Sequence, residues 1–85
     1  MGKIFKLQIK KSFSEVPEKH FIKLPLSTIN WNLRIHRDNK NYVFESSEIS
    51  SLEVGLDLIS FLQNHSLITD VDFEKCKKGM EDHFS

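Results

Sequence analysis

Cysteine, proline and glycine are scarce in this chain, and alanine is absent. A single cysteine cannot form an intramolecular disulfide, which is typical of a protein from a reducing compartment. Three glycines without a clustered motif exclude the phosphate-binding loops of nucleotide enzymes. No apolar run approaches the length of a transmembrane helix, and the first residues lack the apolar core of a signal peptide. We therefore expect a cytoplasmic protein with no membrane partner.

The side chains that catalyse reactions or bind metals are present, but their spacing matches no motif. The four histidines show no metal-ligand spacing with one another or with Cys76. Asp70, Asp72 and Glu74 resemble the start of a calcium loop, but the glycine that such a loop needs at its sixth position is missing. The same acids suit the first turn of a helix, where negative charge is favourable. We expect no metal, no cofactor and no catalytic residue, and we interpret the protein as non-enzymatic.

The single thiol has a chemically ambiguous neighbourhood. Cys76 lies between Lys75 and Lys77, and nearby cations promote thiol reactivity. On a helix, however, adjacent side chains point in different directions, and Cys76 shares its face with Phe73 and Met80. We therefore predict a buried, unreactive thiol.

Charge is sorted along the chain although its total is zero. Residues 1–42 hold nine basic and three acidic side chains, a net charge of +6. Residues 43–85 hold three basic and nine acidic ones, a net charge of −6. Such an asymmetry bears on partners and not on the fold. The zero total also gives little colloidal repulsion, which favours self-association.

The first half of the chain shows the two-residue period of half-buried strands. Phe5, Leu7 and Ile9 alternate with polar residues, and similar alternation recurs further along the chain. Pro25 falls inside the second such segment and favours an edge position, because proline donates no hydrogen bond to a neighbouring strand. The predicted strands are residues 3–13, 20–27, 30–37 and 41–45.

A turn at residues 38–41 joins the last two predicted strands, and its residue types tolerate left-handed backbone. With this turn, Ile35 faces Phe44 and Arg34 faces Glu45 across the hairpin. The first pair is apolar and the second is oppositely charged. The predicted register is therefore consistent on both faces of the hairpin.

The second half of the chain changes to the 3.6-residue period of helices. Residues 50–53 (Ser-Ser-Leu-Glu) match a capping box, and Ile49 with Val54 matches the hydrophobic staple that accompanies it. Gly55 weakens this helix, and we expect it to permit the close approach of a strand. Thr69 is placed to cap a second helix. The predicted helices are residues 51–64 and 70–84.

These elements predict a single domain over residues 1–85 with an α+β fold. Their order is β-β-β-β-α-α, and an antiparallel sheet of three to four strands is packed on one face by two C-terminal helices. In this arrangement positive charge belongs to the sheet and negative charge to the helices.

The outward faces of the predicted helices offer an acidic surface, which can dock a basic protein and speed its encounter. We interpret the chain as a small protein-binding module that occludes a surface of another intracellular protein. Residues with GC-rich codons are scarce, and this composition favours an inhibitor or accessory factor from a phage or other mobile element. The candidate residues of the acidic face are Glu53, Asp57, Glu74 and Glu81.

The sheet face away from the helices suggests an alternative function, nucleic-acid binding. Basic side chains contact phosphates and an aromatic ring stacks on a base, although the preference for lysine over arginine does not favour specific base readout. Attraction between the two layers would explain the same charges without any partner. The candidate residues of this basic sheet face are Lys6, Lys10, Phe21, Lys23, Arg34 and His36.

Overall fold

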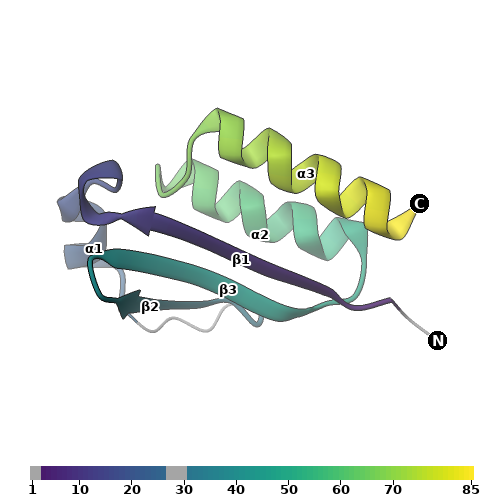
Figure 1. Ribbon diagram of the computed structural model, residues 1–85, viewed down its shortest axis with the longest axis horizontal. Coiled ribbons are helices and arrows are strands. Elements are labelled where there is room, and N and C mark those ends of the chain that lie inside the picture. Colours follow the sequence, from purple (N-terminus) through teal and green to yellow (C-terminus); the bar gives the residue numbers. More distant parts are fainter. Residues whose placement is uncertain (1–2, 27–30) are drawn as a thin grey trace.

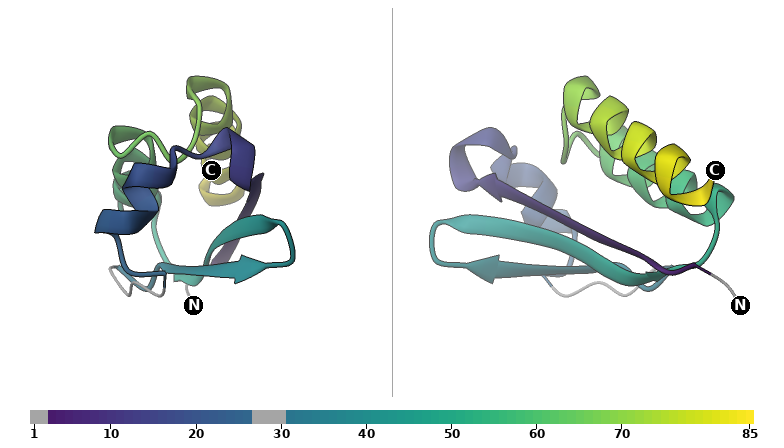
Figure 2. Two further views of the ribbon diagram at one scale, coloured as in Figure 1. Left: turned by 90° about the vertical axis from the view of Figure 1, so that its left-hand side faces the viewer. Right: turned by 45° about the vertical axis from the view of Figure 1, so that its right-hand side comes forward.

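The computed structural model describes residues 3–26 and 31–85, and it shows a three-stranded antiparallel sheet with helices on one face (Figure 1, Figure 2). The predicted α+β fold is thereby confirmed, with three strands. In chain order the elements are β1 (Phe5–Ser12), the 3-10 helix η1 (Phe13–Glu15), α1 (Glu18–Lys23), β2 (Arg34–Asp38), β3 (Asn41–Ile49), α2 (Leu52–Asn64) and α3 (Asp70–Phe84).

The central strand of the sheet is β3, with β1 on one side and β2 on the other. The predicted hairpin register is confirmed, because Ile35 pairs with Phe44 and Arg34 with Glu45. Asn39 in the connecting turn has a φ of 58°, the left-handed conformation that asparagine tolerates. The last strand continues beyond the predicted end at residue 45, because Ser46 still pairs with Leu7 and, after a register shift, Ile49 pairs with Phe5.

The prediction of a strand at residues 20–27 is wrong, as far as the described residues extend. Residues Glu18–Lys23 form α1 instead. The deciding interaction is tertiary: the Phe21 ring stacks on Tyr42 of β3 with a centroid separation of 3.5 Å. In the strand pattern Ile22 belongs to the core, yet its side chain is 78% exposed. α1 lies on the same side of the sheet as the other helices (Figure 2). Its Phe21 ring covers Tyr42 at one end of the sheet.

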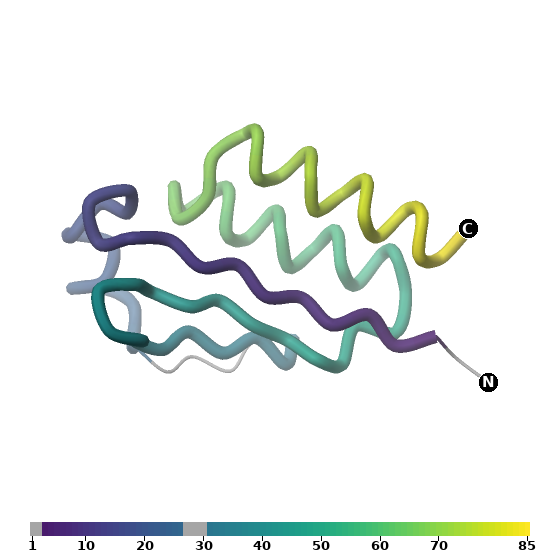
Figure 3. The backbone as a smooth tube through the Cα atoms, in the orientation of Figure 1, coloured from purple at the N-terminus to yellow at the C-terminus, as the bar shows by residue number. Residues whose placement is uncertain are grey.

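The two long helices begin close to their predicted starts. The side chain that caps α2 is Ser51, which accepts a hydrogen bond from the Val54 amide, so the predicted cap is displaced by one residue. Thr69 caps α3 as predicted and forms a reciprocal capping box with Asp72. The two helices run antiparallel beside each other (Figure 3).

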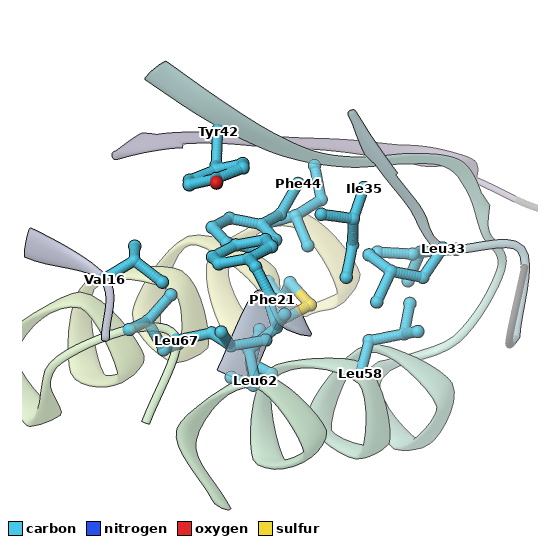
Figure 4. Packing of buried hydrophobic residues seen from close by; sticks show 14 residues of the cluster. Val16, Phe21, Leu33, Ile35, Tyr42, Phe44, Leu58, Leu62 and Leu67 are labelled. Atoms are coloured by element: carbon cyan, nitrogen blue, oxygen red, sulfur yellow. The ribbon is translucent and has the colours of Figure 1, made fainter. Parts of the chain in front are cut away.

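The core lies between the sheet and the helices. Phe44 at its centre is completely buried, and Phe21 reaches it from α1 with ring centroids 6.1 Å apart (Figure 4). Leu58 and Leu62 of α2 enter the core from the side that faces the sheet (Figure 4). One continuous cluster thus joins α1, the sheet and the long helices. Its other members are Leu7, Val16, Leu33, Ile35, Tyr42, Ile49, Ile59, Leu67, Ile68 and Met80.

Gly55 is the point at which α2 comes closest to its neighbours. A Cβ atom at this position would overlap the sulfur of Met80 on α3 and would lie 3.1 Å from Cγ2 of Ile49 at the end of β3. Both neighbours are fully buried and have little room to move. The expected close approach of a strand is therefore confirmed, and a helix meets the same glycine from another side.

Gly55→Ala is expected to lower the free energy of unfolding by about 1 kcal/mol, measured by urea denaturation. Overpacking against Met80 and Ile49 costs about 1–3 kcal/mol, which outweighs a helix-propensity gain of about 1 kcal/mol. Gly79→Ala is the matched control, since its Cβ would meet only Phe5 at 3.9 Å. We expect this control to stabilise the protein. Equal stabilisation by both substitutions would contradict the close contact.

Candidate functional site

The four residues predicted to form an acidic face lie on the two long helices, α2 and α3. Glu53 and Asp57 on α2 and Glu74 and Glu81 on α3 are all exposed. Glu53 at the start of α2 and Glu81 near the end of α3 lie at the same end of the pair, because the helices are antiparallel (Figure 1). Within the part of the chain that the structure describes, none of the four acids makes an ion pair. α2 contains no basic residue, whereas three lysines interrupt the acids of α3.

The predicted basic sheet face is wrong for two of its six residues. Phe21 belongs to α1 and is buried against Tyr42, so it cannot stack on a base. Lys23 is the last residue of α1 and not part of the sheet. The set therefore loses its only phenyl ring. The members that do lie on strands are Lys6, Lys10, Arg34 and His36.

The remaining cations of the sheet are largely paired with acids of the sheet. Oε1 of Glu45 lies 2.9 Å from a guanidinium nitrogen of Arg34 and 3.0 Å from Nε2 of His36. Lys10 pairs with Asp38 at 3.3 Å. The Arg34 guanidinium also holds the pKa of Glu45 below its usual value. Carboxylates at the centre of this face reduce the positive potential that a phosphate backbone needs.

A cavity of about 600 Å³ adjoins this face of the sheet beside the end of β3. Lys6 and Arg34 line it together with Glu45 and Glu48, so its charged side chains balance. Ser47 contributes a small polar side chain to the same wall. The cavity therefore has no charge preference for an anion.

Within the described residues, one ion pair joins the two layers of the fold. Nζ of Lys11 on β1 lies 2.7 Å from Oδ2 of Asp72 on α3 and 2.9 Å from Oε1 of Glu15. The Lys11 side chain is only 11% exposed. Its hydrogen bonds to Asp72 and Glu15 raise the pKa of Lys11. Burial acts to raise the pKa of Asp72, but hydrogen bonds from Lys11 and Thr69 outweigh it and leave that pKa below its usual value.

The Lys11–Asp72 pair predicts a loss of stability in acid. Because the pKa of Asp72 is lowered by folding, its contribution is complete above an unfolded pKa of about 3.9 and is lost as the pH falls through the folded value. We expect Asp72→Asn to lower the free energy of unfolding by about 2 kcal/mol at pH 7 and to weaken its dependence on pH between 5 and 3. Urea denaturation at several pH values measures both effects. Asp57→Asn, which removes an exposed acid, is the control and should change neither; equal effects from both variants would contradict the assignment.

A second cavity lies at the end of the molecule formed by η1, α1 and the β2–β3 turn, and its volume is about 380 Å³. Phe21 and Tyr42 are stacked in its wall, and Phe13 lies 4.5 Å from Tyr42 between ring centroids. The wall of the cavity therefore contains three neighbouring aromatic rings. We call this cavity the α1 pocket, and its lining residues are Phe13, Val16, Glu18, Phe21, Ile22, Leu26, Arg37 and Tyr42.

Arg37 places a guanidinium over the aromatic wall of the α1 pocket. Its Cζ lies 5.3 Å from the centroid of the Phe13 ring and 5.5 Å from that of Tyr42. One terminal nitrogen also donates a hydrogen bond of 3.4 Å to the Tyr42 hydroxyl. Among residues 3–26 and 31–85, no carboxylate pairs with Arg37. Its remaining donors are available to a ligand.

The rim of the α1 pocket is unusually apolar. Ile22 is 78% exposed, and Leu26 and Phe13 are each 39% exposed. Six large hydrophobic side chains are exposed in the described residues, and these three line the same cavity. Grouped exposed apolar side chains mark interaction sites more often than single ones do.

The sequence interpretation missed this site because it assigned residues 20–27 to a strand. A helix-start signal was present: Pro17 precedes an acidic residue, Glu18, and both suit the first turn of a helix. The contribution of Arg37 had no sequence signal, since it depends on the position of η1 against the hairpin.

The thiol, the possible metal ligands and the helices of the described residues were each expected to follow a particular pattern. Burial raises the pKa of the Cys76 thiol and the Asp72 carboxylate raises it further, so its lysine neighbours do not activate it. Across the described ranges, no three histidine, cysteine or acidic side chains gather as a metal site. In the same ranges no helix has the length and apolar character needed to cross a membrane.

No family model, curated protein or solved structure is significantly similar to the chain.

Proposed function

We propose that this chain is a small, non-enzymatic protein-binding module that occludes a partner's surface with its α1 pocket. The observation that carries the proposal is the grouping of Phe13, Ile22 and Leu26 at the rim of one cavity. Exposed apolar side chains gain free energy when a partner removes them from water, about 25 cal/mol per Å² buried.

The shape of the molecule suits this role. It measures 38 × 23 × 21 Å, and α1, whose residues help to line the pocket, lies at one end of the long axis (Figure 1). The first and last described elements meet at the other end, where the rings of Phe5 and Phe84 are 6.4 Å apart. The end that carries the pocket can therefore enter a partner's cleft while the opposite end stays outside.

The acidic face of the helix pair supports a second contact with the same partner. Glu53 and Asp57 lie on a helix without basic residues and make no ion pair in the part described. Unpaired acids of this kind attract a basic surface and raise the association rate at low salt. Nucleic-acid binding by the sheet stays the alternative, and the ion pairs of Arg34 and Lys10 make it the weaker one.

We further propose that the protein acts in the cytoplasm as an inhibitor or accessory factor of a phage or other mobile element. The support for this setting is the composition: one half-buried cysteine without a disulfide partner and few residues with GC-rich codons.

Ile22→Asp is expected to weaken partner binding at least about fivefold, because loss of an important apolar contact costs more than about 1 kcal/mol. Ile22 is largely exposed, so the free energy of unfolding should change by less than about 0.5 kcal/mol. Val71→Asp on α3 is the matched control, since Val71 is 64% exposed and lies outside the pocket.

The measurement is quantitative comparison of proteins captured from source-cell extract by wild type and both variants, each immobilised through its C-terminus. Species retained by wild type and Val71→Asp but lost by Ile22→Asp would support the proposal. An identical set with all three proteins would contradict it. Asp57→Lys is immobilised as a fourth protein. If the captured species are lost with this variant alone, the binding site lies on the acidic face.

A further inference from the structure

Arg37 is the only basic side chain in the lining of the α1 pocket. The guanidinium lies over the neighbouring rings of Phe13 and Tyr42, and the Tyr42 hydroxyl accepts one of its hydrogen bonds. These contacts hold the planar group in place without using all of its donors. Because no carboxylate of the described residues neutralises it, the pocket combines an apolar cavity with a pre-oriented cationic fork.

A guanidinium in this position matches a carboxylate, which it can bind through two parallel hydrogen bonds. The cavity of about 380 Å³ beside it is near the lower end of the range for ligand pockets and suits one large apolar side chain. We propose that the α1 pocket recognises an acidic-hydrophobic segment of the partner protein. An apolar side chain enters the cavity, and an adjacent Asp or Glu pairs with Arg37. This inference rests on the proposed function.

A chain segment fits the surface better than a small molecule does. A small molecule inside the cavity would leave the outward side of Ile22 in water, where it is 78% exposed. Leu26 extends the apolar rim further around the mouth. A peptide chain that crosses the rim can cover both side chains while it places one residue in the cavity.

Glu18 sets the geometry of the acidic group. Glu18 also lines the pocket, and its negative charge repels a second anion. The partner's acid is therefore favoured on the side of Arg37 and disfavoured beside Glu18. It follows that Glu18→Gln should bind an acidic segment about twofold more tightly, since one exposed like-charge contact is worth a few tenths of a kcal/mol.

Three capped heptapeptides test the charge preference. They share a central Leu-Phe-Leu and carry two Glu, two Gln or two Lys at each flank. Titration into isotopically labelled protein at low salt, followed by amide chemical shifts, gives both the site and the affinity. We expect shifts at α1 and Arg37, with the Glu peptide binding at least about fivefold more tightly than the Gln peptide.

Arg37→Gln should abolish this difference and leave the affinity for the Gln peptide unchanged. Lys10→Gln, an exposed cation outside the pocket, is the matched control and should preserve it. Equal binding of the Glu and Gln peptides at the pocket would overturn the acidic-hydrophobic preference but retain the proposed function. Absence of shifts at the pocket with all three peptides would overturn the pocket as a binding site, and the proposed function with it.

Discussion

The close contact at Gly55 is the constraint on which the arrangement of layers depends. Without a side chain there, α2 approaches both Met80 of α3 and Ile49 at the end of β3. The turn between β3 and α2 is therefore fixed within one tightly packed corner of the molecule. The other end of the sheet lies beyond that corner, so the Tyr42 ring needs a separate cover. Phe21 supplies it, and α1 exists in its observed position because of that contact.

The sorted charge of the sequence does not produce a uniformly positive sheet. Glu45 lies in the middle strand and neutralises Arg34 on its neighbour, so the sheet balances much of its own charge. One cation, Lys11, crosses to Asp72 of the helical layer and is largely buried there. Attraction between the layers is thus real at one point, where it contributes to folding. The acids of α2 take no part in that ion pair. Their negative charge is therefore available to a partner.

Local signals in the sequence were sufficient for the hairpin and both long helices. A turn of fixed length places Ile35 opposite Phe44, and no distant residue is needed to decide the pairing. Residues 20–27 differ because their alternation fits a strand as well as a helix. A six-residue helix has little stability by itself, so the choice is made by burial of Phe21 against Tyr42, a contact between segments far apart in sequence. Such a contact has no signature in the local pattern.

The same cause explains why the candidate site escaped the sequence interpretation. A short helix held by one buried ring leaves its other faces exposed, and Ile22 lies on one of them. The exposed part of its side chain contributes nothing to the core. Ile22 lines the same pocket as Arg37, whose guanidinium lies over aromatic rings and has no acidic partner in the described chain. Burial of an isoleucine side chain is worth about 1.5–3 kcal/mol. That free energy is not gained on folding, and it becomes available only when a second surface covers the α1 pocket.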